Sequence, residues 1–269
     1  MLTWNVDPII YQIGPIQLRW YSLSFFCGFA IGYYYFAKLF EREGRTQEEC
    51  SRLLMYIFLG TLIGARLGHC LLYEPEFYLR HPIEIIAFWK GFAGLASHGG
   101  YTGVIIATFL YLYKTKGMSF FWLIDRLSGP CLLTGAFIRI GNLFNSEIIG
   151  KPSDVPWAVI FERIDSVPRH PAQVYEAIGY FLIAMTLFLM VKLFSNKWTQ
   201  GRIFGFALAL SFAFRFCVEF IKENQVDFET GMVLNMGQLL SIPFVLIGIF
   251  LISGKQKDVP WLGFLSKKF

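Results

Sequence analysis

The chain has 269 residues, of which 55% are hydrophobic and only 16% are charged, and its mean hydropathy is +0.50. Since an average soluble domain carries about 25% charged residues, this composition excludes an ordinary soluble domain and indicates an integral membrane protein. The net charge of +5 needs no nucleic-acid partner, because basic residues commonly flank membrane spans on the cytoplasmic side and no basic tract with interleaved aromatics is present.

Seven apolar segments follow one another along the chain. Each is long enough to cross the hydrocarbon core of a bilayer as a helix, which needs about 20 residues. The sequence therefore predicts an all-α integral membrane protein with about seven transmembrane helices in a single domain, 1–269. The segments are 19–40, 53–73, 93–113, 119–138, 172–194, 202–222 and 233–253.

The distribution of Lys and Arg predicts how these segments are oriented. The connections after the first, third and fifth segments and the C-terminal tail hold twelve of the 24 basic residues, whereas the chain before Arg19 holds none. By the positive-inside rule, the C-terminus is expected in the cytoplasm and the N-terminus outside.

Two of the expected outside connections have distinct patterns. Residues 74–92, "EPEFYLRHPIEIIAFWKGF", are punctuated by proline and predict an amphipathic arm in the membrane interface. Residues 151–171, "KPSDVPWAVIFERIDSVPRHP", alternate apolar and polar residues between prolines. This alternation predicts a small extracytoplasmic cap with short strands.

Ionisable residues lie inside several of the apolar segments, where an unpaired charge costs several kcal/mol. Arg215 and Glu219 are four residues apart, so they share a helix face and either neutralise each other or serve a site. Arg66 and His69 either belong to a site or extend to a nearby interface. His98, at the mouth of the third segment, is either an interface histidine or a catalytic one.

The stretch "RIGNLFNSEIIG", which runs from Arg139 to Gly150, gathers polar side chains directly after an apolar segment. Gly141 and Gly150 allow an irregular backbone, whose freed groups Asn145 and Glu147 can bind. Irregular backbone at membrane depth is tolerated only where protein or a watery cavity covers it. The stretch therefore predicts either a re-entrant structural turn or a polar cavity that holds an anion near Arg139.

The balance of charges favours an anionic ligand over a metal. Arg66, Arg139 and Arg215 lie in or beside the apolar segments, and no Asp/Glu cluster suited to a metal accompanies them. The five cysteines form no CxxC pair, so neither a zinc site nor a disulfide framework is predicted. Because the guanidinium fork suits phosphate, and the most available anion in a bilayer is a phospholipid headgroup, we expect a lipid phosphate here.

The stretch also resembles the signature of the phosphatidylglycerol–prolipoprotein diacylglyceryl transferase family, approximately G-R-x-G-N-F-x-N-x-E-x-x-G. Ile138 and Leu143 depart from that signature at apolar or backbone positions, so its polar chemistry is kept. The matching residues are Arg139, Gly141, Asn142, Asn145, Glu147 and Gly150.

Further motifs extend the resemblance over essentially the whole chain. His69 stands where the family usually has Tyr, and Ser211 stands where the family often has a Tyr four residues before Arg215. The matching stretches are "RWYSL" at 19–23, "GARLGH" at 64–69, "SHGGYTG" at 97–103, "PRHPAQVYEA" at 168–177, "FRFCVEF" at 214–220 and "MGQLLSIP" at 236–243.

The resemblance implies a reaction without metal or other cofactor. The diacylglyceryl group of phosphatidylglycerol passes to the lipobox cysteine of a bacterial preprolipoprotein, just after the apolar core of its signal peptide, and glycerol phosphate leaves. It also implies a place in the bacterial cytoplasmic (inner) membrane, with phosphatidylglycerol and preprolipoproteins as partners.

The family pattern assigns roles to particular residues. Arg139 and Arg215 are implied to hold the phosphate, His98 to act as the base toward the substrate thiol, and Tyr21 to position lipid or thiol. The residues implied to bind phosphatidylglycerol are Arg66, Arg139, Asn142, Asn145, Glu147, Gly150, Arg215 and Glu219.

Three other classes of protein compete with this interpretation. A transporter or channel also uses intramembrane charges and glycine-broken helices, but the inverted repeat common in transporters is absent from the sequence. Another transferase acting on phosphatidylglycerol fits the same charges. A non-catalytic membrane scaffold leaves the buried arginines unexplained.

Overall fold

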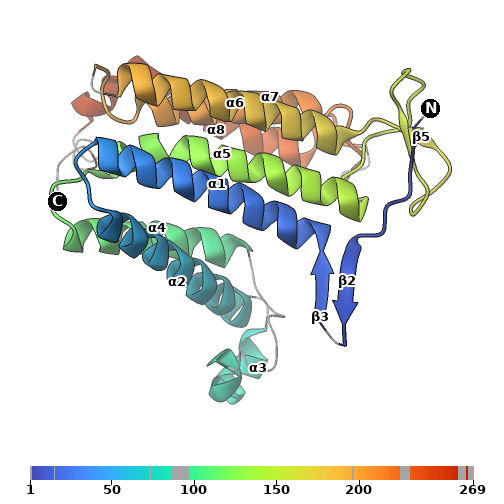
Figure 1. Ribbon diagram of the computed structural model, residues 1–269, viewed down its shortest axis with the longest axis horizontal. Helices are drawn as coiled ribbons and strands as arrows, with labels where there is room; N and C mark the ends of the chain where they lie inside the picture. The colour runs from blue at the N-terminus through green and yellow to red at the C-terminus, as the bar shows by residue number, and fades with distance from the viewer. Residues whose placement is uncertain are drawn as a thin grey trace. The chain divides into compact units, whose positions relative to one another are not determined.

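The structure, a computed structural model, describes residues 2–14, 16–72, 74–86, 97–195, 197–224, 231–259 and 265. It is mostly helical (Figure 1), as the sequence predicts, and each of the seven apolar segments contains a helix. The chain divides into two compact units. The first is built from Met1–Phe36 and Phe121–Ser266, and the second from Ala37–Phe120.

Five of the described helices are long and apolar enough to cross a membrane: α1 (Trp20–Arg42), α2 (Gln47–Leu72), α5 (Phe120–Asn145), α6 (Ala172–Phe194) and α8 (Met236–Ser253). Two others are shorter. Helix α7 (Arg202–Val218) has 17 residues, and the apolar part of α4 (Ser97–Lys114) covers Thr102–Lys114. The prediction of a helical membrane protein with several spans is confirmed, and the count of seven stays a prediction.

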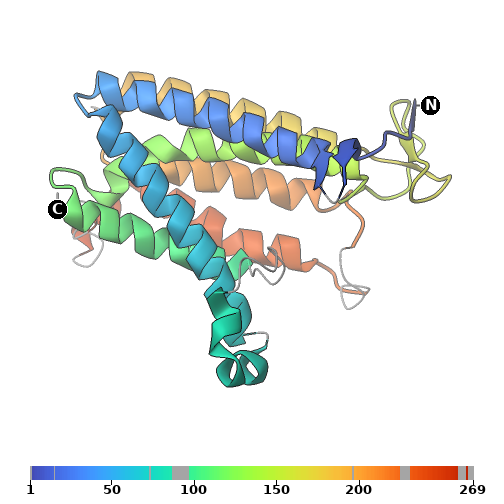
Figure 2. The same ribbon diagram turned by 60° about the horizontal axis from the view of Figure 1, so that its bottom comes forward.

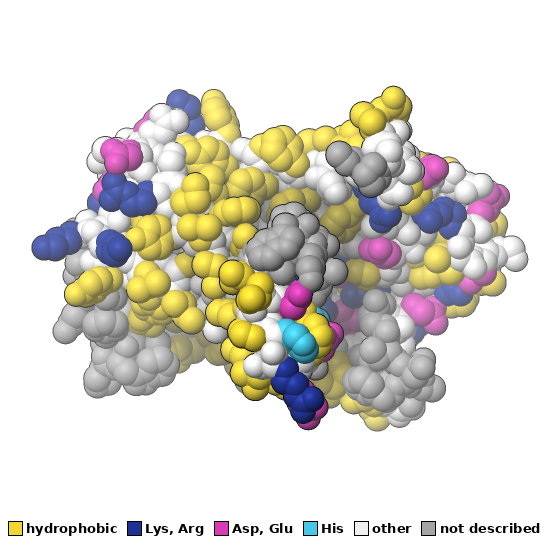
Figure 3. Space-filling model, turned by 90° about the horizontal axis from the view of Figure 1, so that it is seen from below, with side chains coloured by type: hydrophobic (Ala, Val, Ile, Leu, Met, Phe, Trp, Pro, Cys, Tyr) yellow, Lys and Arg dark blue, Asp and Glu magenta, His cyan; other side chains and the backbone are white. Residues whose placement is uncertain are grey.

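Large apolar side chains lie on the outside of these helices. Figure 3 shows hydrophobic side chains gathered on one face, and Phe26, Phe58 and Ile249 are 65%, 59% and 56% exposed. Such a surface suits lipid rather than water, because soluble monomers rarely expose large contiguous apolar patches.

In the first unit, α1, α5, α6, α7 and α8 pack one against the next. Glycines lie at each contact, because a missing side chain lets two helices approach closely. The contacts are Gly28 on Phe137, Gly129 on Phe188, Gly179 on Phe214, and Gly205 on Gly248.

A buried carboxylate fixes the start of α7 against α5. Asp125 is 4% exposed and accepts hydrogen bonds from the backbone N–H groups of Gly201 at 2.7 Å and Phe204 at 2.8 Å. These N–H groups have no partner inside their own helix, so Asp125 acts as a cap supplied by another helix. The register of α7, and with it the position of Arg215 near its other end, is thereby set.

Five short strands accompany the helices in the described part of the chain. β4 (Val159–Phe161) pairs antiparallel with β5 (Pro168–Arg169) and parallel with β1 (Leu2–Trp4), while β2 (Ile9–Ile13) and β3 (Ile16–Arg19) form a hairpin. The short strands predicted within 151–171 are therefore present. The strands before residue 20 were not predicted. For β1 the reason is that its partner is more than 150 residues away in the chain, whereas β2 and β3 form a local hairpin.

The second unit contains α2, α4 and the arm, with α2 and α4 side by side (Figures 1 and 2). Within the predicted arm 74–92, the chain forms α3 (Pro75–Arg80) and the 3-10 helix η1 (Pro82–Ile86). Residues 87–92 lie outside the described residues.

Candidate active site

The first polar group of the site lies at the end of α5. The predicted segment ends at 138, but the helix continues to Asn145, so Arg139 and Asn142 are one turn apart on the same face. Arg139 Nη1 donates to Asn142 Oδ1 at 3.3 Å, and Asn142 Nδ2 donates to Glu147 Oε2 at 3.1 Å. Asn145 Nδ2 donates to the other oxygen of Glu147 at 3.1 Å. Glu147 therefore reaches Arg139 only through Asn142.

The chain leaves α5 through an irregular turn, as the sequence predicts, but not at the expected residues. Ser146 and Ile148 have positive φ angles of 55° and 57°, whereas Gly141 lies inside the helix. Such angles are unfavourable for residues with side chains and need support from neighbours. Gln173 of α6 supplies it by donating to the carbonyl of Glu147 at 2.6 Å. Gly150 continues this support, since its N–H donates to the carbonyl of His170 at 3.0 Å.

Several polar atoms at this turn are buried without a partner. They are Asn145 Oδ1, the Ser146 hydroxyl and Gln173 Oε1, which have no hydrogen bond to any part of the chain that the structure describes. Because buried polar atoms normally have partners, this end of α5 suits a polar ligand or bound water.

A second group of charges surrounds Glu176, which the sequence motif contained but to which no role was assigned. Glu176 is 0% exposed and its Oε2 lies 3.1 Å from Arg139 Nε. Its Oε1 lies 3.7 Å from Lys222 Nζ. The ring of Tyr180, one turn further along α6, lies 5.9 Å from the Arg139 guanidinium carbon. Arg139 is thus held on one side by a carboxylate and on another by an aromatic ring.

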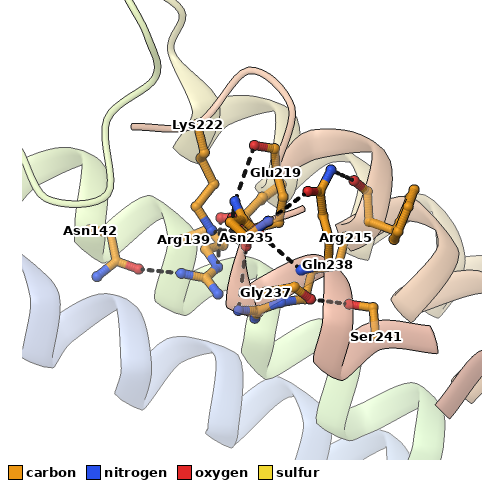
Figure 4. Close-up of polar contacts among 11 residues, drawn as sticks. Arg139, Asn142, Arg215, Glu219, Lys222, Asn235, Gly237, Gln238 and Ser241 are labelled. Carbon is orange, nitrogen blue, oxygen red and sulfur yellow. Dashed lines mark hydrogen bonds and ion pairs between the residues drawn. The ribbon is translucent and has the colours of Figure 1, made fainter. Parts of the chain in front are cut away.

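The same lysine links this group to the end of α7 (Figure 4). Lys222 Nζ lies 2.7 Å from Glu219 Oε1, and Arg215 Nη2 lies 3.4 Å from that oxygen. Asn235 Nδ2, at the start of α8, donates to Glu219 Oε2 at 3.2 Å. The pairing of Arg215 with Glu219 that the sequence left open is therefore present, but it is part of a larger network.

We call Arg139, Glu176, Lys222, Glu219 and Arg215 the charged cluster. Three cations in it face two carboxylates, so it carries one excess positive charge. Both carboxylates and the lysine side chain are at most 4% exposed, whereas the side chains of Arg139 and Arg215 are 15% and 35% exposed. The two arginines are therefore the members that an incoming anion can reach.

Other predicted site residues lie outside the charged cluster. Arg66, in the second unit, donates to the carbonyls of Ile85 at 2.9 Å and Glu84 at 2.6 Å, and its guanidinium lies 5.2 Å from the ring of Tyr78. These contacts attach the arm to α2, and a role of Arg66 toward lipid stays a prediction. The backbone of His98 begins α4, but its side chain lies outside the described residues.

Ser211, which replaces the family tyrosine, does not take up a role in this network. Its hydroxyl donates to the carbonyl of Ala207 at 2.5 Å, within its own helix. Tyr175 is also engaged elsewhere, because its hydroxyl accepts from Trp157 Nε1 at 2.7 Å and lies 3.2 Å from His170 Nδ1. Tyr180 is the tyrosine that lies beside Arg139.

A bridge outside the charged cluster fastens the cap strands to the end of α7. Arg169 of β5 donates to Asp165 Oδ2 at 2.6 Å and to Glu223 Oε2 at 2.7 Å. Its hydrogen bonds hold the pKa of the Asp165 carboxyl below its usual value. No group of three or more His, Cys, Asp or Glu arranged for a metal occurs within the described ranges.

Tyr21 of α1 packs directly on Gly141 of α5. A Cβ at Gly141 would lie 2.8 Å from Tyr21 Cδ2 and 3.1 Å from Tyr21 Cα. We expect Gly141→Ala to lower the free energy of unfolding by about 1–3 kcal/mol through this overpacking, and to slow the reaction because Tyr21 must move.

Gly135→Ala, in the same helix, is the matched control. A Cβ there would lie 3.7 Å from Tyr180 Cδ2, an ordinary contact, so it is expected to raise the free energy of unfolding by up to about 1 kcal/mol through better helix propensity. Unfolding of both variants in detergent measures the difference. Equal effects of the two alanines would contradict close packing of Tyr21 on Gly141.

The fold defines a helical membrane protein, and the charged cluster gives it a buried network with one excess positive charge. The family model described as prolipoprotein diacylglyceryl transferase matches residues 8–253. A phosphatidylglycerol–prolipoprotein diacylglyceryl transferase of Tolumonas auensis is 50% identical over 259 residues, which cover 96% of this chain and 99% of that protein.

Two further proteins with the same name are similar to this chain at lower identity. The one from Chloroherpeton thalassium is 46% identical and covers 95% of this chain and 94% of its own length. The one from Vibrio campbellii is 37% identical, with coverage of 92% and 90%. The chain therefore belongs to the prolipoprotein diacylglyceryl transferase family.

Proposed function

We propose that this protein transfers the diacylglyceryl group of phosphatidylglycerol to the lipobox cysteine of preprolipoproteins, the first step of lipoprotein maturation. The observation that carries the proposal is the excess positive charge of the charged cluster, which includes Arg139 of the signature stretch. Glu176, Arg215 and Glu219 belong to two of the other matching stretches. One excess charge matches the single negative charge of a phosphodiester, and the two arginines supply planar forks suited to its oxygens.

The reaction forms a bond between the cysteine sulfur and the glyceryl carbon and breaks the bond from that carbon to the phosphate oxygen. The phosphate leaves on its glycerol and gains negative charge as the bond breaks. Donors that are in place before the reaction stabilise such developing charge. Arg139 donates one N–H to Asn142 and forms an ion pair with Glu176, and further N–H groups of its five remain for a phosphate oxygen.

The thiol of the substrate must lose its proton, because the thiolate is the nucleophile and an ordinary cysteine has a pKa of about 8.5. His98 is our candidate base, with Tyr21 beside the signature helix as a positioning residue. Replacing His98 with Gln is then expected to lower the rate most below pH 8, where little thiolate forms unaided. Rates near those of the unmodified protein from pH 6 to 9 would exclude this role.

The proposal includes a topology in the bacterial inner membrane. We infer seven spans, with the short α4 and α7 crossing beside the five longer helices, the N-terminus outside and the C-terminus in the cytoplasm. The arm 74–92 and the cap 151–171 then lie on the outer side, and the chain acts as one domain over 1–269. The basic connections support this orientation.

The first experiment incubates purified protein with phosphatidylglycerol and a lipobox peptide that contains one cysteine. Release of glycerol phosphate is expected only when the thiol is present, and Arg139→Ala is expected to abolish it. Absence of release from folded protein would contradict the proposed transfer. Release that survives in Arg139→Ala would contradict the role of the charged cluster.

A further inference from the structure

Helices α2 and α4 of the second unit pack through glycines rather than through side chains. A Cβ at Gly64 would lie 2.8 Å from the Cα of Gly103, and one at Gly99 would lie 2.8 Å from the Cα of Gly68. The two backbones therefore touch. Glycines spaced by four residues produce this kind of approach between helices in a bilayer.

The close approach leaves a groove above the glycines, with a volume of about 690 Å³. The wall from α2 is a stripe of apolar side chains four residues apart: Met55, Leu59, Ile63, Leu67 and Leu71. The wall from α4 is a second stripe at the same spacing, with two apolar side chains after a threonine: Thr102, Ile106 and Leu110. Because the floor is backbone, these side chains rise above it on both sides, and Ile63 and Ile106 are 53% and 55% exposed.

The length of the groove selects the kind of occupant. Met55 and Leu71 are sixteen residues apart, which is about 24 Å along a helix. A lipid acyl chain reaches only through one leaflet, about 15 Å of the roughly 30 Å hydrocarbon core. The apolar core of a signal peptide has about 7–15 residues and as a helix is about 10–22 Å long. The longest of these cores, at about 22 Å, nearly match the length of the groove, whereas one acyl chain covers about 15 Å of it.

The two ends of the groove give the occupant a direction. Glu48 and Glu49 lie in the first turn of α2, near the Met55 end, and Glu48 is 81% exposed. Arg52 pairs with Glu48 at 2.8 Å, but a pair this exposed is weak, so another cation can compete for the carboxylate. Glu49 is paired with Arg45, so Glu48 is the carboxylate with which the basic region at the start of a signal peptide can pair.

The other end of the groove reaches Gly99 and Leu71, near the start of α4 at Ser97, and His98 is the second residue of that helix. A signal peptide that enters with its basic region at Glu48 presents the residues after its apolar core at this end. The lipobox cysteine follows that core directly, so its thiol arrives where the candidate base lies in the chain.

We propose that the α2–α4 groove binds the apolar helix of the preprolipoprotein signal peptide, with its basic region near Glu48 and its cysteine near His98. The proposal rests on the proposed function, which supplies the peptide substrate. It assigns recognition of the protein substrate to the second unit and recognition of the phosphate to the charged cluster of the first.

A matched pair of variants tests the groove. Ile106→Trp narrows it, whereas Ile105→Trp changes a neighbouring isoleucine with nearly the same exposure, 53% against 55%, that does not line it. Rates are compared for an acceptor with a complete signal peptide and one with the lipobox alone. We expect Ile106→Trp to lower the ratio of kcat/KM for the long over the short acceptor by about tenfold, and Ile105→Trp to leave it unchanged.

A second measurement detects binding of the signal peptide directly and does not depend on transfer of the diacylglyceryl group. A photo-crosslinking amino acid is placed at position 106 or 105, and the purified protein is irradiated with the complete signal peptide in phosphatidylglycerol micelles. Cross-links to the peptide are expected from position 106 and not from 105. If the protein releases no glycerol phosphate, the proposed function fails, and this measurement still decides what the groove binds.

Three results would overturn the proposal. The first is equal cross-linking of the peptide from both positions. The second is a rise in the KM for phosphatidylglycerol rather than for the long acceptor in Ile106→Trp, which would assign the groove to acyl chains. The third is cross-linking from position 106 to a second copy of this chain.

Discussion

Replacing Arg139 with lysine is expected to lower kcat by about two to three orders of magnitude although the positive charge is kept. Arginine holds Glu176 through Nε and Asn142 through Nη1 at the same time as it offers donors to phosphate. A lysine ammonium is a single point that can satisfy Glu176 but cannot also form a planar, two-pronged contact. The developing charge on the leaving phosphate therefore loses its best-placed donors.

Stability and kinetics together separate this effect from simple misfolding. Since the lysine still pairs with buried Glu176, the unfolding temperature in detergent should stay near that of the unmodified protein. The loss should fall on kcat more than on the KM for phosphatidylglycerol, because charge on the phosphate grows toward the transition state. Arg163→Lys, an exposed arginine in the cap, is the control and should retain full activity. Retention of most of kcat in Arg139→Lys would refute the bidentate role.

The positions of the helices were largely predictable from the sequence, because the backbone N–H and C=O groups of an apolar segment in lipid must form hydrogen bonds within that segment. Helix α6 has the predicted bounds, 172–194, since Pro171 precedes it and polar residues follow it. The end of α5 was not predictable from hydropathy. Its last turn carries Arg139 and Asn142, and it is helical because Glu176 of α6 and Glu147 bind those side chains.

The site was predictable only as far as the motifs extended. The signature identified Arg139, Asn142 and Glu147, which are neighbours in the chain and in the structure. Glu176 was missed because its partner Arg139 is on another helix, and Lys222 was missed because it joins Glu219, three residues away, to Glu176 of α6. One signal was available. Glu176 is a lone carboxylate inside the apolar segment 172–194 and needs a cation from elsewhere, while Arg139 has no carboxylate within one helical turn of it in the chain.

Replacing Glu176 with glutamine is expected to lower the free energy of unfolding by about 3–5 kcal/mol, the largest effect on stability that we predict for the charged cluster. Glu176 is 0% exposed and lies between Arg139 at 3.1 Å and Lys222 at 3.7 Å. Glutamine keeps the size of the side chain but removes its charge, which leaves two excess positive charges in a buried network. Unfolding of the purified variant in detergent, followed by circular dichroism, measures the loss.

The double variant Glu176→Gln/Lys222→Met shows whether charge balance or shape causes the loss. Removing one charge of each sign restores the original excess of one, so the double variant should be more stable than Glu176→Gln alone. Lys222→Met by itself should cost less than Glu176→Gln, because Glu219 keeps Arg215 at 3.4 Å and Glu176 keeps Arg139. A double variant no more stable than Glu176→Gln would show that the geometry of the glutamate, and not its charge, holds the network.

The same variant links stability to the anionic substrate. A ligand that binds only the folded protein stabilises it, and the gain grows with affinity. Glu176→Gln carries one more excess positive charge than the unmodified protein, so added phosphatidylglycerol should raise its unfolding temperature by more. An equal rise of the unfolding temperature in both proteins would mean that the lipid phosphate does not interact with the charged cluster. The headgroup site would then have to lie elsewhere.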